Sequence, residues 1–345
     1  MHAIEKILAA AAGRKEVKTG EIVNCKVDLA GINDLYLQTV RSFFEMGGTK
    51  VHDPDKVIIY LDHYAPASTM MQAHNHKKFR EFAKQQGIEK LMDIDQGVCH
   101  QITVEQGLTY PGAVIVITDS HSTTHGALGA FGTGVGATDL AIILATGQLW
   151  FRIPEIIKFN LEGELPAGTY AKDIILKIIG DMGADYGLYK GVEFAGSALQ
   201  QLSVSERMAL CNMTTEMGAK TAYIQPDEIT FEYLRDRVNK SYTVYETDPG
   251  YLYAAEHTYD VSRLKPQAAA PHSVANVADI AKFAGTNIDQ AFLGTCTGGR
   301  LEDLAIAAKI LRGKKIRKDT RLGVVPAAKN VLLAAIEQGI MTTLI

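Results

Sequence analysis

The sequence predicts a mainly parallel α/β fold, because short β-branched runs alternate with segments of helical spacing. Two runs carry this prediction, KVIIYLDH (56–63) and AVIVITDSH (113–121), and both are apolar segments that end in polar residues. Uninterrupted apolar runs of this length are typical of strands buried on both faces. Ligands of such sheets bind at the carboxyl ends of the strands, which is where the polar residues fall.

Helical spacing follows each of these strands. In QAHNHKKFREFAKQQG (72–87) the phenylalanines share one side and a glycine ends the segment. In ATDLAIILATGQLWF (137–151) we expect a helix capped by Thr138 or Asp139.

Strands and helices restart in the second half of the chain. We expect helices in AKDIILKIIGDMG (171–183) and SVSERMALCNMTTEMGAK (203–220), the second opened by a Ser-x-x-Glu-like cap. A short strand, GVEFAG (191–196), lies between them. The turn-rich segment 244–277 reads as a linker or domain edge, and a strand, glycine turn and helix follow in 290–313.

Composition and charge argue against several classes of function. The chain of 345 residues is long enough for two or three domains, and 47% hydrophobic and 21% charged residues are ordinary for a globular protein. A net charge of −4 gives no electrostatic case for binding nucleic acid or an anionic membrane. No apolar run approaches the ~20 residues of a membrane span. The opening MHAIEKILAAAAGRK reads as an amphipathic helix rather than a secretion signal, so we expect a cytoplasmic protein.

Four cysteines, Cys25, Cys99, Cys211 and Cys296, are spaced too widely for a disulfide framework or a zinc knuckle. We expect reduced thiols, with Cys211 a buried hydrophobe. Cys296 lies in a glycine-rich turn before a predicted helix, where backbone N–H groups and the helix dipole would lower the pKa of its thiol. Its local chemistry suits both a nucleophile and a metal ligand.

Histidines and carboxylates gather after the two strands and in a third loop, GVCHQ. The members of this set are Asp62, His63, His100, Asp119, Ser120 and His121. A carboxylate can hold a neighbouring imidazole in one tautomer and shift its pKa into the range useful for proton transfer. The set therefore predicts a polar site without specifying its reaction.

Other histidines and the glycine run have structural interpretations. His74 and His76, two apart on a charged helix, are expected to face solvent, as are His257 and His272 in the turn-rich segment. The glycines of 126–136 match neither a dinucleotide-binding nor a phosphate-binding loop. We expect them to let strand, turn and helix pack closely.

Five segments occur in an order that points to a family. They are LDHYAP, GVCHQ, TDSHSTTHGALGAFGTGVGATDLA, VEFAG…NMTTEMGAK and GTCTGGRLEDL. In their specific residues they resemble the aconitase superfamily, and within it the branch of isopropylmalate dehydratase, homoaconitase and dimethylmalate dehydratase large subunits. The resemblance extends over nearly the whole chain, and the DSH segment with its glycine tail is a specific signature.

The resemblance implies an aconitase-like fold of three α/β domains with mainly parallel sheets around a central cleft. We expect these domains at 1–154, 155–270 and 271–345, with the third incomplete. The implied activity is that of a hydro-lyase that isomerises a 2-hydroxy dicarboxylate by dehydration and rehydration. Isopropylmalate is the first choice of substrate, ahead of homocitrate, dimethylmalate and citramalate. In the family a 4Fe-4S cluster held by three cysteines acts as the Lewis acid.

The family's motifs also imply roles for residues at matching positions. Cys296 matches the first cluster ligand. Proton-handling or hydroxyl-orienting roles, with His100 paired to Glu193, are implied for Asp62, His63, His100, Asp119, His121 and Glu193. Substrate contacts are implied for Asn33, Asp34, Asp119, Ser120 and His121.

Two features depart from the family pattern. Gly298 stands where the family has asparagine, and the Cys-x-x-Cys turn that supplies the other two cluster ligands is not among residues 1–345. The arginines that clamp substrate carboxylates are also outside this range. We therefore expect a truncated large subunit without a complete cluster, or a divergent relative that uses none.

The expected partner is a separate small subunit, because no segment resembles the swivelling domain that carries the family's catalytic serine. Neither nucleic acid nor a membrane is expected as a partner. Two other classes stay open. Some aconitase relatives bind RNA after losing the cluster, although the acidic net charge disfavours this. Alternatively, Cys296 acts as a nucleophile with one of the histidines as base and without iron.

Overall fold

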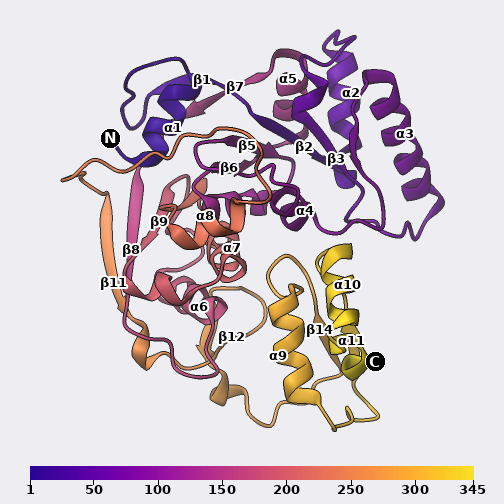
Figure 1. The fold of residues 1–345 in the computed structure, drawn as a ribbon, viewed down its shortest axis with the longest axis vertical. Coiled ribbons are helices and arrows are strands. Elements are labelled where there is room, and N and C mark those ends of the chain that lie inside the picture. The colour runs from indigo at the N-terminus through magenta and orange to yellow at the C-terminus, as the bar shows by residue number, and fades with distance from the viewer.

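The computed structural model describes residues 1–345 and confirms the mainly parallel α/β class. Figure 1 shows the N-terminal part, in indigo to purple, above the middle of the chain, with the yellow C-terminal part to one side. No helix has both the length and the apolar character needed to cross a membrane. The division into three domains stays a prediction.

A five-stranded parallel sheet of order β4-β3-β2-β5-β6 is the centre of the N-terminal part. Its strands are β2 (Leu29–Asn33), β3 (Val57–Tyr60), β4 (Lys90–Met92), β5 (Val114–Ile117) and β6 (Phe131–Gly134). Neighbouring residues face two different hydrophobic clusters, since Ile59 and Val116 belong to one and Ile58 and Ile115 to the other. Burial on both faces explains the uninterrupted apolar runs in the sequence.

Helices cover both faces of this sheet. They are α1 (Ala3–Ala11), α2 (Leu37–Glu45), α3 (Met70–Gln86), α4 (Cys99–Glu105) and α5 (Ala137–Thr146). The predicted helix α3 begins at a Thr69 capping box and ends at Gly87, which adopts the left-handed conformation. The opening segment also forms the expected helix, α1.

Helix α5 is shorter than predicted. Gly136 precedes it in place of either expected cap residue, and Gly147, at a φ of 71°, ends it. Residues Gln148–Arg152 form strand β7, which pairs antiparallel with β1 (Ile22–Lys26). The alternation of exposed and buried side chains in β7 is the period of a strand, and the helical prediction overlooked it.

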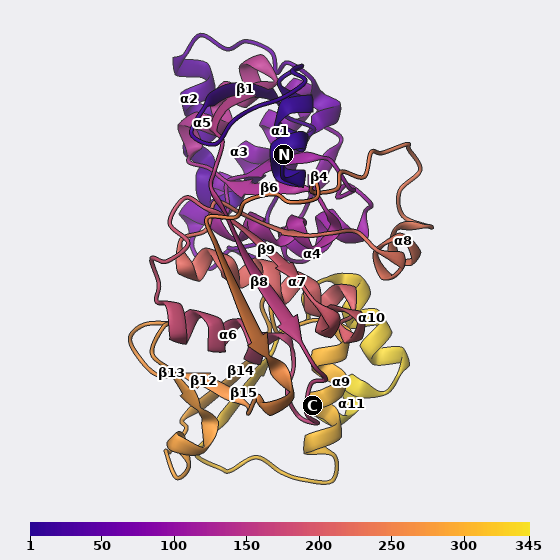
Figure 2. The same cartoon turned by 90° about the vertical axis from the view of Figure 1, so that its left-hand side faces the viewer.

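A second parallel sheet, of order β10-β9-β8-β11, holds the middle of the chain. Its strands and the nearby helices are β8 (Ile156–Glu162), β9 (Gly191–Ala195), β10 (Thr221–Ile224), β11 (Ala255–Asp260), α6 (Ala171–Met182), α7 (Val204–Asn212) and α8 (Glu228–Leu234). Helix α6 and strand β9 were predicted, whereas the helix predicted over 203–220 is shorter, because α7 ends at Asn212 and a 3₁₀ helix, η5 (Met213–Met217), follows it. Strand β11 lies inside the segment predicted as a linker, and in Figure 2 it runs beside β8, its parallel partner. Of the two interpretations of this segment, a linker or a domain edge, the linker is therefore wrong for this strand.

The C-terminal part contains two strand pairs and three helices. They are β12 (Gln267–Ala269), β13 (Val277–Asp279), β14 (Gln290–Leu293), β15 (Arg321–Val324), α9 (Leu301–Leu311), α10 (Lys329–Glu337) and α11 (Ile340–Leu344). The strand, glycine turn and helix predicted in 290–313 are β14, the turn around Cys296 and α9. A small hydrophobic cluster between α9, α10 and α11 holds this part together.

Candidate active site

Most of the predicted site residues lie at one edge of the five-stranded sheet. Asn33 ends β2, Asp62 follows β3, and Asp119 follows β5. Because neighbouring parallel strands end at the same edge, the fold brings these side chains together from distant parts of the sequence.

His63 bridges two of the carboxylates. Its Nδ1 lies 2.9 Å from Asp62 Oδ1, and its Nε2 lies 3.3 Å from Asp119 Oδ2. Burial lowers the pKa of His63, but the hydrogen bonds with Asp119 and Asp62 outweigh burial and raise this pKa to about 10. Burial likewise favours the neutral acids, yet the histidines keep the pKa of Asp62 and of Asp119 below the ordinary range. His63 is therefore an imidazolium between the carboxylates of Asp62 and Asp119 at neutral pH.

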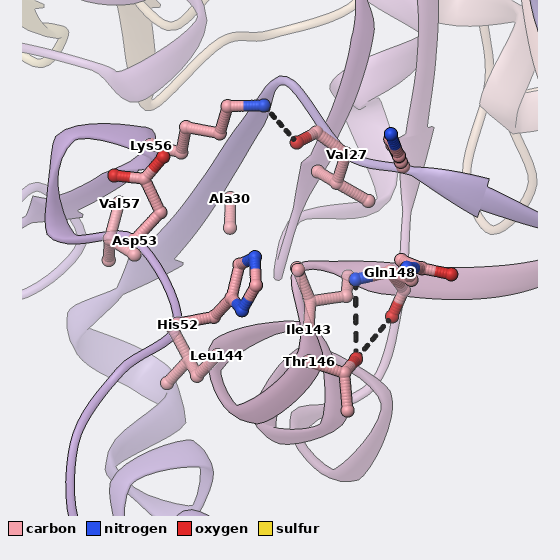
Figure 3. Close-up of a pocket in the computed structure, with 12 residues that line it drawn as sticks. Val27, Ala30, His52, Asp53, Lys56, Val57, Ile143, Leu144, Thr146 and Gln148 are labelled. Atoms are coloured by element: carbon pink, nitrogen blue, oxygen red, sulfur yellow. Dashed lines mark hydrogen bonds between the residues drawn. The ribbon is translucent and has the colours of Figure 1, made fainter.

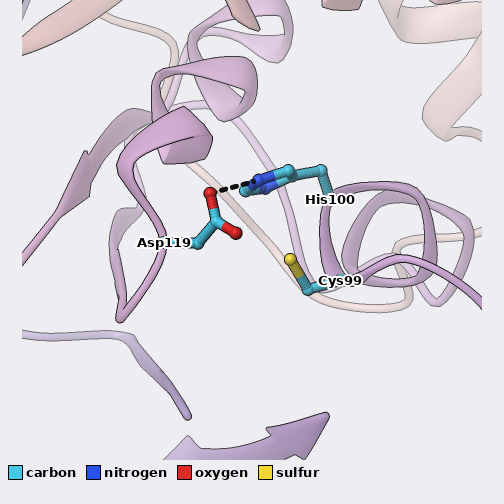
Figure 4. Close-up of side chains that lie close together, drawn as sticks. All are labelled: Cys99, His100 and Asp119. Carbon is cyan, nitrogen blue, oxygen red and sulfur yellow. Dashed lines mark hydrogen bonds and ion pairs between the residues drawn. The ribbon is translucent and has the colours of Figure 1, made fainter. Parts of the chain in front are cut away.

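Asp119 is the shared partner of three histidines. Besides His63, it contacts His100 Nε2 at 3.0 Å and accepts the backbone N–H of His121 at 2.9 Å. Figure 4 shows the His100 ring directed at this carboxylate, with the Cys99 thiol close by. One potential metal-ligand atom from each of Cys99, His100 and Asp119 lies within 4.8 Å of the other two. The same holds for a second set, formed by Asp34, Asp62 and His63. Burial raises the pKa of the Cys99 thiol, so it stays protonated without a metal.

His121 is held by a carboxylate that the sequence analysis missed. Its Nε2 lies 3.0 Å from Glu216 Oε1, and its Nδ1 lies 3.2 Å from the Ser120 hydroxyl. The Asp119 carboxylate, 3.8 Å from Nδ1, and to a smaller extent Glu216 raise the pKa of His121 against the effect of burial. Glu216 lies in the quoted segment NMTTEMGAK, so the signal was present in the sequence.

Glu193 does not pair with His100. Its Oε2 lies 2.5 Å from His2 Nε2 and accepts a hydrogen bond from the Tyr253 hydroxyl at 2.9 Å. Its neighbours Val192 and Phe194 belong to the hydrophobic cluster of the second sheet, so Glu193 points to the opposite face. The expected His100–Glu193 pair is therefore absent, and His100 pairs with Asp119 while His121 pairs with Glu216.

Asn33 and Asp34 are buried, and both are engaged within the protein. Asn33 Nδ2 donates to both oxygens of Asp62, at 3.1 and 3.2 Å. Asp34 accepts the backbone N–H groups of His63 and Tyr64 and contacts His76 Nε2 at 2.9 Å. The expected direct contact of Asp34 with substrate stays a prediction, whereas a positioning role is visible.

His76 is buried by this contact, so the expectation that it faces solvent is wrong. His257 also differs from expectation, since it is half-buried and its Nε2 lies 2.6 Å from the Tyr186 hydroxyl. His74 and His272 are exposed, as expected.

Cys296 reaches the same region from the C-terminal part. Asn212 Nδ2 donates to Cys296 Sγ at 3.2 Å and to Thr124 Oγ1 at 2.7 Å, and Thr124 Oγ1 donates to the His121 carbonyl. This chain of contacts links the thiol to the histidines. Burial raises the pKa of Cys296 and outweighs the opposing effects of Arg300 and Asn212, so the expected lowering is wrong.

The cysteines of residues 1–345 can supply one ligand of a 4Fe-4S cluster, but not all of the ligands that a cluster requires. Such a cluster requires three or four protein ligands, usually thiolates. Cys25, Cys99 and Cys211 are buried in three different hydrophobic clusters, which leaves Cys296 as the one partly exposed thiol of residues 1–345. Cys211 is the buried hydrophobe that was expected.

The glycines after the DSH segment permit close packing, as predicted. Residues Ser120–Leu128 form a 3₁₀ helix, η3, that packs on β10. A Cβ on Gly126 would lie 1.9 Å from the Ala222 carbonyl oxygen, and one on Gly132 would lie 2.3 Å from that of Ser122. Side chains at these positions would push η3 away from its neighbours.

The cavity in Figure 3 lies apart from this site. It encloses about 80 Å³ and is lined by residues that include His52, Lys56 and Gln148, near the amino ends of β2 and β3 and the end of α5. The candidate site is at the carboxyl ends of the same strands.

Fold and site together define a class of protein, an α/β protein with histidine–carboxylate pairs at the carboxyl edge of a parallel sheet. Comparison with known sequences identifies the family. A sequence model of the aconitase family (aconitate hydratase) matches residues 5–287 and 280–345, and the chain belongs to this family.

Curated relatives are similar over almost the whole chain. A "3-isopropylmalate dehydratase large subunit 1" of Methanopyrus kandleri is 47% identical, over 99% of this chain and 81% of the relative. A protein of the same name from Pyrococcus furiosus is 45% identical, over 98% and 80%. A "Probable methanogen homoaconitase large subunit" of Methanothermobacter thermautotrophicus is 44% identical, over 100% and 82%.

Proposed function

We propose that the chain is the large subunit of a hydro-lyase that isomerises 3-isopropylmalate by dehydration and rehydration. The observation that carries the proposal is the meeting of three pairs, Asp62–His63, His100–Asp119 and His121–Glu216, beside the Cys296 turn. The names of the relatives at 45–47% identity support isopropylmalate, and the homoaconitase relative makes homocitrate the alternative.

The surroundings of the histidines support different roles for them. Loss of the substrate hydroxyl requires a proton donor whose pKa is near the working pH. His63 has a pKa of about 10 and is therefore a weak acid at neutral pH. It suits a positioning role between Asp62 and Asp119. His100 is only 1% exposed and orients Asp119. His121, with 30% of its side chain exposed, is the histidine that we assign as proton donor.

Substrate binding and cluster binding are assigned to neighbouring groups. The Ser120 hydroxyl, next to His121 Nδ1, is placed to contact a substrate carboxylate. Cys296 would hold one corner of a 4Fe-4S cluster, with the Asn212 amide on its sulfur. The remaining cluster ligands and the base that removes the carbon-bound proton are not assigned to residues of this chain. The relatives' designation as large subunits supports a separate small subunit as partner.

The test is turnover by the full-length gene product that contains this chain, in complex with its cognate small subunit and reconstituted with iron and sulfide, because residues 1–345 supply only Cys296 as a cluster ligand. We expect 3-isopropylmalate to be dehydrated faster than homocitrate, and His121→Asn to lower the rate about 10²-fold or more. His74→Gln, on an exposed position of α3, is the matched control and keeps full activity. Faster turnover of homocitrate would transfer the assignment to homoaconitase, and no turnover of either acid by the reconstituted complex would refute it.

A further inference from the structure

A second pocket lies next to the Cys296 turn. It encloses about 240 Å³ between the first turns of α6, α7 and α9. Its polar lining includes Lys172, Ser205, Glu206, Thr297, Arg300 and Asp303. None of these residues belongs to the histidine–carboxylate set.

Two cations line this pocket without a carboxylate partner. Lys172 is partly buried and forms no ion pair and no side-chain hydrogen bond, and burial lowers the pKa of its ammonium group against the opposing effect of the Asp303 charge. Arg300 is 2% exposed and donates to Gln101 Oε1 at 2.9 Å and to the Ser205 carbonyl at 3.3 Å. Its Nη2 is buried without any partner. An unpaired buried guanidinium nitrogen is costly, so this arrangement favours an anionic ligand.

Two of the acids that line the pocket accept hydrogen bonds from backbone N–H groups at helix N-termini. Glu206 accepts the Ser203 N–H at 3.1 Å, and Asp303 accepts the Arg300 N–H at 2.9 Å. Burial raises the pKa of both acids. The third acid of the lining, Glu302, is exposed to solvent. The amino ends of three helices add partial positive charge at the same place.

The pocket reaches the candidate site along one face of α7. Ser205, Ala209 and Asn212 follow the spacing i, i+4, i+7, and Asn212 donates to the Cys296 thiol. A Cβ on Gly298 would lie 3.4 Å from Lys172 Nζ, which is an ordinary contact distance. The Lys172 ammonium therefore lies against the turn that carries Cys296.

We propose that this pocket binds a carboxylate group of a small organic acid, with Lys172 as its principal cation and Arg300 as its support. That this acid is the substrate, bound here through its second carboxylate, rests on the proposed function. Carboxylate binding itself does not depend on turnover, so the two can fail separately.

The test uses the 345-residue chain with succinate as the dicarboxylate probe and inorganic phosphate as a competing anion, both measured by calorimetry. We expect Lys172→Met to weaken succinate binding about tenfold or more, the usual effect of losing one charged hydrogen bond. Lys172→Arg, which keeps the charge, should retain most of the affinity. Lys177→Met is the matched control, because Lys177 lies on the same helix and its ion pair with Asp181 faces solvent.

Three results would overturn the proposal: no succinate binding by the wild-type chain, equal weakening by Lys172→Met and Lys177→Met, or phosphate binding as tight as that of succinate. Thermal melting of each variant separates loss of binding from loss of folding. Succinate binding that depends on Lys172, together with no turnover of 3-isopropylmalate by the reconstituted complex, would keep the pocket and reject the substrate.

Discussion

His121 Nε2 lies 3.0 Å from Glu216 Oε1, although 95 positions separate the two residues in the chain. Residue Glu216 lies in the segment after helix α7, whereas His121 is in the first turn of η3, and these two segments pack closely against each other. Asp119 approaches the same imidazole from its other side, with Oδ1 3.8 Å from Nδ1. The protonation of His121 therefore depends on carboxylates from two distant parts of the sequence.

Substitution of Glu216 by glutamine should lower the pKa of His121. Glu216 favours the imidazolium form by hydrogen bonding and charge, and glutamine keeps the shape without the charge. The pKa is measured by NMR titration of the His121 ring protons, and the activity of the complex with the small subunit should begin to fall at a lower pH than in the wild type, because less imidazolium is present there. Glu81→Gln, an exposed carboxylate on α3, is the control. An unchanged titration of His121 in Glu216→Gln would contradict this role.

The sequence predicted the site residues whose positions follow from the strand directly before them in the chain. Asp62, His63, Asp119 and His121 directly follow strands, and parallel strands necessarily end at a common edge. Glu216 was missed because its position depends on how the segment after α7 packs against η3. No periodicity within one element encodes such a contact.

Three other errors have the same origin. Glu193 lies in a strand of a recognised motif, but the alternation of side chains directs it to His2 on the opposite face. His76 lies on a polar helix whose contact with Asp34 was not visible in the sequence. The pKa of Cys296 was expected to fall because of the following helix, yet burial by its neighbours raises it. In each case tertiary packing overrides a local rule.

Replacement of Gly126 by alanine should destabilise the fold by about 3 kcal/mol. The added Cβ would lie 1.9 Å from the Ala222 carbonyl oxygen, so η3 and β10 would have to separate. Gly136→Ala is the matched control, because nothing lies within 4 Å of its Cβ and its φ is −74°. We expect this control to change the free energy of unfolding by less than about 1 kcal/mol. Urea denaturation of both variants checks the prediction, which equal effects would refute.

The stability of the chain should fall as the pH rises from about 6.5 to about 10. The ordinary pKa of histidine is 6.5, whereas the pKa of folded His63 is about 10. Within this window the folded state keeps a proton that the unfolded state releases, so each step upward in pH favours unfolding. The stabilisation from His63 is therefore fully present below pH 6.5 and lost above pH 10.

Urea denaturation at pH 7 and pH 9 measures this effect. His63→Gln removes the titrating group and should show a smaller loss of stability between the two pH values than the wild type. His74→Gln, which removes an exposed histidine, should behave as the wild type. A loss in His63→Gln as large as that in the wild type would assign the pH dependence to other groups.

Alkylation of the native chain by iodoacetamide should modify Cys296 alone, and more slowly than free cysteine. Cys25, Cys99 and Cys211 are buried in hydrophobic clusters, whereas Cys296 is partly exposed. The thiolate is the reactive form, and burial raises the pKa of Cys296, so little thiolate is present at pH 7.5. Mass spectrometry of the digested protein locates the label, and denatured protein, in which all four cysteines react, is the control. Reaction of Cys296 faster than free cysteine would instead favour an activated nucleophile, because such a residue must be a thiolate at neutral pH.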